Sequence, residues 1–109
     1  LLIGWTGDNG DPDNFLGTLL GCAAIKGGSN YARWCNKEFD KLVTDARQAP
    51  DQATRTQLYM KAQEVFKKEL PWVTLAHAKA FRAMEKRVKG YSMSPFGTDY
   101  FGSVVVEKK

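Results

Sequence analysis

The chain has 109 residues, of which 43% are hydrophobic and 26% charged, and its formal net charge is +4. This composition is typical of one folded globular domain and excludes an intrinsically disordered chain. No apolar run reaches the roughly 20 residues of a membrane helix, and no signal-peptide pattern is present. Because the sequence starts without Met in a strand-like segment, we expect a C-terminal piece of a longer protein.

The first fifteen residues combine an apolar run with an acidic turn. Residues 1–5 predict a buried strand, and the glycines and carboxylates that follow predict a polar loop at one edge of a sheet. We expect Asp11 to cap a helix that starts at Pro12, where the missing N–H costs nothing. Asp13 would then oppose the helix dipole in the first turn.

Asp8 is the candidate binding residue of this loop. It is the first ionisable side chain after the strand, so it could pair with a cationic group, and Trp5 would exclude water and strengthen that pair. The residues alone leave open that Asp8 only organises the turn. A hydrolase with Asp8 and Asp11 as its carboxylate pair is a second hypothesis, which no sequence spacing singles out. A calcium loop is excluded, because oxygen-bearing side chains do not recur at alternate positions.

Three helices are predicted after the turn. The first ends at Gly21, the second spans residues 37–49 behind an Asn36 cap, and the third spans residues 51–70 and stops at Pro71. The second and third form a helical hairpin. Apolar residues at helical spacing are expected in the core: Phe15, Leu19 and Leu20 in the first helix, Phe39, Leu42, Val43 and Ala46 in the second, and Leu58, Ala62, Val65 and Phe66 in the third.

Between the first two helices, residues 22–35 predict an irregular loop that begins and ends with a cysteine. Cys22 and Cys35 are too far apart in sequence for a CxxC redox or zinc motif. Two cysteines around a glycine-rich stretch favour a disulfide and an oxidising compartment. Two buried free thiols remain the alternative.

After the helices the hydrophobic period changes to that of strands. Residues 72–77, 88–93 and 103–106 predict short strands, with a turn at 94–97 before the last. The basic excess lies here, but these side chains alternate with Ala, Met and Val, which predicts a solvated face and no nucleic-acid partner. His77 is interpreted as structural, because no second His, Ser or Cys lies at a catalytic spacing. The element order, a strand, three helices and then strands, predicts an α/β or an α+β fold.

Several of these motifs together resemble one protein family. The stretch Gly-Trp-Thr-Gly-Asp-Asn-Gly-Asp-Pro-Asp-Asn-Phe at residues 4–15, followed by the two cysteines, Ser29-Asn30-Tyr31 and Trp34, closely resembles the C-terminal region of periplasmic dipeptide-binding proteins. These are solute receptors of ABC importers in the peptide-, nickel- and haem-associated family. The likeness continues through Leu70-Pro71, Ala76-His77 and Val88-Lys89-Gly90-Tyr91, and so covers nearly the whole chain.

The resemblance implies the C-terminal portion of a two-lobed α/β receptor that is exported to the periplasm, closes around a peptide and delivers it to an inner-membrane ABC permease. It implies a binding protein without cofactor or metal, and no enzyme. In this family the residue matching Asp8 pairs with the N-terminal ammonium of the peptide, and Gly4, Trp5 and Thr6 would supply neighbouring contacts. Cys22 and Cys35 match the disulfide of the family.

The resemblance also implies a division of the chain. Residues 1–77 would complete the second, peptide-clamping lobe, and residues 78–109 would cross over and return to the first. The upstream lobes of the same protein would carry the rest of the site, including the residue that binds the peptide carboxylate. Some members bind haem or other ligands, so a haem- or other-peptide-binding receptor remains the alternative within the family.

Overall fold

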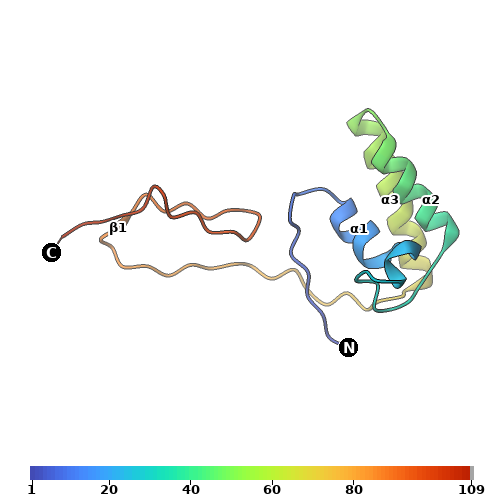
Figure 1. Ribbon diagram of the computed structural model, residues 1–109, viewed down its shortest axis with the longest axis horizontal. Coiled ribbons are helices and arrows are strands. Elements are labelled where there is room, and N and C mark those ends of the chain that lie inside the picture. The colour runs from blue at the N-terminus through green and yellow to red at the C-terminus, as the bar shows by residue number, and fades with distance from the viewer. Residues whose placement is uncertain (109) are drawn as a thin grey trace.

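The computed structural model describes residues 1–108, which form a helical body and a long arm. Figure 1 shows the helices packed together at one end, an extended connector, and a narrow hairpin whose tip points back toward the helices. The elongated molecule measures 61 × 36 × 25 Å. The predicted order of three helices followed by short strands is confirmed.

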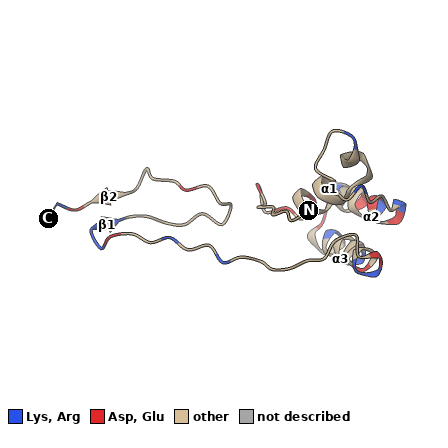
Figure 2. Ribbon diagram, turned by 90° about the horizontal axis from the view of Figure 1, so that it is seen from below, with Lys and Arg blue, Asp and Glu red and all other residues tan. Residues whose placement is uncertain are grey.

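The body is built around a helical hairpin. Helix α2 (Lys37–Gln48) and helix α3 (Gln52–Glu69) lie side by side and match the predicted ranges to within one residue at each end. Asn36 caps α2 as predicted, and Asp51, predicted as the first residue of the third helix, instead caps α3. Each side chain accepts a hydrogen bond from the backbone N–H three residues later. Leu70 ends α3 in the left-handed conformation, with φ 48°. Figure 2 shows cationic and anionic residues interspersed on both helices, as on a solvated surface.

The core fills the space between the hairpin and the first helix. Ala46 and Ala62 are completely buried, and their small side chains let α2 and α3 approach closely. Trp34 packs edge-on against Phe39 with 4.9 Å between ring centroids. The buried apolar residues are Leu19, Leu20, Phe39, Val43, Ala46, Tyr59 and Ala62. The sequence did not identify Tyr59 as a core residue.

The first helix, α1 (Asp13–Leu20), is joined to the hairpin by a cross-linked loop. A short 3-10 helix, η1 (Cys22–Ile25), follows Gly21 where an irregular loop was predicted. The disulfide between Cys22 and Cys35 is present, with 4.7 Å between their Cα atoms. The prediction that Phe15 is buried was wrong, because its side chain is 40% exposed. The residues of α1 that are buried in the core are Leu19 and Leu20.

The arm contains one small antiparallel sheet. Strand β1 (Val88–Lys89) pairs with strand β2 (Val105–Val106), and Val88 lies opposite Val106. Gly90 follows β1 with φ +75°, in the left-handed region that favours glycine. No helix among the described residues is long and apolar enough to cross a bilayer.

Two predicted strands are absent from the described structure. Residues 1–5 and 72–77 have no partner strand within residues 1–108, and their side chains are mostly exposed. A strand is held by hydrogen bonds to a neighbouring strand, so an apolar sequence pattern alone does not form one.

The basic residues of the arm form a solvated face, as predicted. Arg82 donates to Asp99 at 3.1 Å, and Arg87 donates to Glu85 at 2.6 Å. The hydrogen bond from Tyr91, together with the one from Arg82, lowers the pKa of Asp99 and keeps it charged. These cations are therefore partly neutralised within the arm.

Candidate functional site

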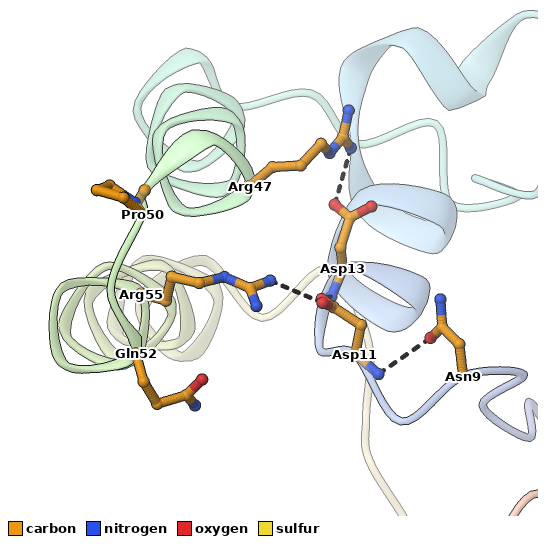
Figure 3. Close-up of a pocket in the computed structure, with 8 residues that line it drawn as sticks. Asn9, Asp11, Asp13, Arg47, Pro50, Gln52 and Arg55 are labelled. Atoms are coloured by element: carbon orange, nitrogen blue, oxygen red, sulfur yellow. Dashed lines mark hydrogen bonds and ion pairs between the residues drawn. The ribbon is translucent and has the colours of Figure 1, made fainter.

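The acidic turn between the first residues and α1 is anchored to the helical hairpin by two ion pairs (Figure 3). The Nη2 atom of Arg55 donates to Asp11 Oδ2 at 2.7 Å, and the Nη2 atom of Arg47 donates to Asp13 Oδ1 at 2.8 Å. The guanidinium of Arg55 also donates through Nε to the carbonyl of Ala46, at 3.1 Å. The turn is therefore attached to both helices of the hairpin.

The carboxylates of Asp11 and Asp13 are each paired with an arginine, which stabilises their ionised form. The hydrogen bond from Arg55 lowers the pKa of Asp11, and a backbone hydrogen bond from Asp13 lowers it further. A carboxyl that stays ionised in this way cannot donate a proton as a general acid. In the carboxylate-pair hydrolase hypothesis, Asp11 is therefore suited to the role of the ionised carboxylate and not to that of the acid.

The start of α1 differs by one residue from the prediction. The helix begins at Asp13 with Pro12 in the capping position, instead of at Pro12 with Asp11 as its cap. The Asp11 carboxylate still accepts a hydrogen bond from the backbone N–H of Asp13, at 2.9 Å. This is an Asx-type turn, in which a carboxylate bonds the backbone two residues on.

Asp8 has a different environment from the other two carboxylates of the turn. It is exposed, and within residues 1–108 it takes part in no ion pair. Its Oδ2 accepts a hydrogen bond from Asn14 Nδ2 at 3.0 Å. Asn14 Oδ1 in turn accepts from the backbone N–H of Asp8 at 3.1 Å and from Trp5 Nε1 at 2.9 Å. One amide side chain therefore holds both Asp8 and Trp5.

The remaining predicted site residues, Gly4, Trp5 and Thr6, directly precede the turn in the chain. Trp5 is 37% exposed, and the backbone of Gly4 is open, since a Cβ atom there would meet nothing within 4 Å. A Cβ atom at Gly97 would lie 3.2 Å from the methyl group of Thr6. Gly97, in the turn between β1 and β2, thus lies beside Thr6.

A polar hollow of about 430 Å³ lies between the turn and the helix break (Figure 3). The four charged side chains that line the hollow are those of the two ion pairs described above. Each of these charges is therefore neutralised by another residue of the same lining. The hollow is lined by Asn9, Asp11, Asp13, Arg47, Ala49, Pro50, Gln52 and Arg55. Within residues 1–108, no group of three His, Cys, Asp or Glu side chains is placed to hold a metal ion.

Sequence reasoning missed the residues that hold this turn in place. Arg47 and Arg55 flank the break between α2 and α3, and nothing in their spacing indicates that they reach back to the acidic turn. Asn14 lies in the motif at residues 4–15, but no local pattern predicts that its side chain accepts two hydrogen bonds and donates a third.

No family model matches the chain, but individual proteins do. The chain is 48% identical over 99% of its length to Di/tripeptide-binding protein 1 of Pseudomonas aeruginosa. It is 47% identical over 99% of its length to Heme-binding protein A of Haemophilus influenzae. The chain is homologous to the dipeptide-binding proteins. It spans about 20% of the length of each of these relatives.

Solved structures agree with this relationship and with the fold. A dipeptide-binding protein from Pseudoalteromonas sp. SM9913, in complex with Met-Leu, superposes with a TM-score of 0.83 and 39% identity over 94% of this chain and 20% of that one. An ABC transporter-associated periplasmic binding protein from Helicobacter pylori, in complex with the peptide STSA, gives a TM-score of 0.76 and 34% identity over 95% of this chain and 21% of that one. The predicted resemblance, the fold class and the disulfide are all confirmed.

Proposed function

We propose that the chain is part of a periplasmic solute-binding receptor of an ABC importer that captures dipeptides or other short peptides, and that it is no enzyme. In this proposal the carboxylate of Asp8 pairs with the free N-terminal ammonium of the peptide, and Trp5 forms an apolar wall beside that pair. The backbone at Gly4 and Thr6 supplies neighbouring contacts. Backbone contacts together with capture of a terminal amine give tolerance of peptide sequence with strict recognition of its end.

The observation that carries this proposal is the contrast among the three carboxylates of the turn. Asp11 and Asp13 each bind an arginine of the helical hairpin, whereas Asp8 has no cation within residues 1–108. An ionised carboxylate beside an indole attracts a cation more strongly than one in open water, because the ring displaces solvent. Asp8 is therefore the carboxylate of this turn best placed to accept a charged ligand.

We propose the same division of the chain that the resemblance implies. Residues 1–77, which contain the turn and the helical body, complete the peptide-clamping lobe. Residues 78–109 cross over to the other lobe, for which the exposed apolar side chains of the connector provide a contact surface: Phe81 is 80% and Met84 48% exposed. The rest of the longer protein would cover these side chains and supply the group that binds the peptide carboxylate.

The experiment that tests the function uses the full-length protein and isothermal titration calorimetry with Met-Leu. We expect Asp8→Asn, which removes the charge but keeps the shape, to weaken binding about thirtyfold or more, equivalent to about 2 kcal/mol for a ligand charge left unpaired. N-acetyl-Met-Leu, which has no ammonium, should bind the wild type weakly.

The matched control is Asp13→Asn, which removes the same charge from the same turn but at a carboxylate that already binds Arg47. Its affinity for Met-Leu should stay within about twofold of wild type, since surface substitutions away from a ligand have small effects. Equal affinities of Asp8→Asn and wild type for Met-Leu would refute the role of Asp8.

A haem-binding receptor is the second candidate, and the 47% identity to Heme-binding protein A favours it. The two functions differ in a simple measurement. Titration of the ligand-free protein with haemin would produce a saturable shift of the Soret band for a haem receptor. A peptide receptor would show calorimetric binding of Met-Leu that haemin does not displace.

A further inference from the structure

The side chain of Asn14 in α1 forms three hydrogen bonds with Trp5 and Asp8. Its carbonyl oxygen accepts from the indole of Trp5 and from the backbone of Asp8, and its amide nitrogen donates to the carboxylate of Asp8. An asparagine amide has two acceptor sites and two donors. Both acceptor sites and one donor are therefore used within the turn.

These contacts fix which way the amide faces. If the oxygen and nitrogen changed places, the NH2 group would face two N–H donors, and the oxygen would face the carboxylate of Asp8. Both arrangements are repulsive. The carboxylate of Asp8 and the indole of Trp5 therefore both bond to the same amide group, and both favour the same orientation of that group.

Asn14 belongs to a helix that packs in the core, whereas Trp5 lies in a segment without secondary structure. It is the second residue of α1, whose far end buries Leu19 and Leu20 in the core. The residue before it, Asp13, binds Arg47 on α2. Residues 1–7, in contrast, have no secondary structure. The indole of Trp5 and the carboxylate of Asp8 are thus connected to α1 through the side chain of Asn14.

We propose that Asn14 is the positioning residue of the amine-recognition site: it aims the carboxylate of Asp8 and the ring of Trp5 at the same ligand group. The inference rests on the proposed function, and adds to it the residue that determines selectivity for a free amine. Asn14 donates to only one oxygen of the carboxylate. The other oxygen is left to accept from a ligand ammonium, with a direction set by the first hydrogen bond.

The test compares two asparagine-to-alanine variants of the full-length protein, Asn14→Ala and Asn9→Ala. Asn9 lies in the same turn and accepts a hydrogen bond from the backbone of Asp11, but within residues 1–108 its side chain has no hydrogen bond to Asp8 or Trp5. Alanine is the best helix former, so Asn14→Ala should keep α1 intact. Calorimetry with Met-Leu and N-acetyl-Met-Leu then measures how far each variant prefers the free amine.

We expect Asn14→Ala to reduce the preference for Met-Leu over its acetylated form at least about tenfold, the effect of losing one charge-assisted hydrogen bond. Asn9→Ala should keep the wild-type preference. A general loss of structure would weaken both peptides together and leave their ratio unchanged. Equal preference in Asn14→Ala and wild type would overturn the proposal.

A second measurement needs no ligand. The indole N–H resonance of Trp5, identified by its absence from Trp5→Phe, should shift to higher field in Asn14→Ala because the hydrogen bond to Asn14 is lost, and should stay in place in Asn9→Ala. An unshifted resonance in Asn14→Ala would also overturn the proposal. If instead Asp8→Asn binds Met-Leu like wild type while the resonance shifts as expected, the proposed function fails and the anchoring by Asn14 stands.

Discussion

Removal of the disulfide is expected to destabilise the helical body without changing its folded structure. The perturbation is the double substitution Cys22→Ser with Cys35→Ser. The cross-link joins residues 13 apart in sequence. In the chain-entropy description, a bridge across a loop of this size stabilises the folded state by about 3 kcal/mol, because it limits the conformations of the unfolded chain.

The folded loop should persist because a second, non-covalent bridge lies beside the disulfide. The side-chain amide of Asn30 donates to the carbonyl of Gly21 at 3.0 Å and to the carbonyl of Trp34 at 2.8 Å. These two residues directly precede the two cysteines. The side chain of Asn30 is also almost fully buried, at 3% exposure, so the bridge is protected from water. The effect of the double substitution should therefore arise in the unfolded state.

The assay is hydrogen exchange of the α2 amides in the full-length protein, followed by mass spectrometry. We expect the free energy of opening of the slowest α2 amides to fall by about 3 kcal/mol, while the affinity for Met-Leu at low temperature stays unchanged. A reducing agent should reproduce the effect in the wild type and have none in the double variant. Unchanged α2 exchange, or loss of peptide binding in the folded double variant, would refute this reasoning.

Three further outcomes are expected. Phe39→Ala, at a completely buried position, should lower the free energy of unfolding by about 3–5 kcal/mol in urea titrations; a loss below about 1 kcal/mol would contradict its place in the core. The folded-state pKa of Asp11 lies below its ordinary value of 3.8, so its stabilising contribution is present above that pH and is lost as the pH falls through the folded pKa. Arg55→Gln should flatten this acid dependence, and an unchanged pH profile of unfolding would count against the ion pair. Gly10→Ala should reduce the midpoint of thermal unfolding more than Gly27→Ala: φ is positive at both, at +71° and +83°, but only at Gly10 would the new Cβ atom lie 3.0 Å from an aromatic ring. Equal unfolding midpoints of Gly10→Ala and Gly27→Ala would show that the contact with the aromatic ring has no effect on stability.

The helical half of the fold could be predicted because its determinants are local. Asn36 and Asp51 cap their helices through contacts three residues away, and the apolar spacing of α2 is repeated within the helix itself. The disulfide was also expected, although free thiols could not be excluded from the residues alone. Motif similarity then pointed to the dipeptide-binding proteins, which the relatives and solved structures confirm.

The strands and the architecture of the site could not be predicted in the same way. Residues 1–5 have the composition of a strand but find no partner within residues 1–108, and pairing between strands is a long-range property. The anchoring of Asp11 by Arg55 spans 44 residues, and that of Asp13 by Arg47 spans 34. Contacts at such separation follow from tertiary packing and leave no periodic signal in sequence.

The two arginine contacts have a consequence for the energetics of ligand capture. A turn that is already tied to α2 and α3 does not have to become ordered when a ligand arrives, so little conformational freedom is lost there on association. Binding to a preorganised turn therefore avoids the entropy cost that ordering a mobile loop would subtract from the binding free energy. In the receptor that we propose, the turn should move with its helices as a single rigid unit when the peptide is enclosed.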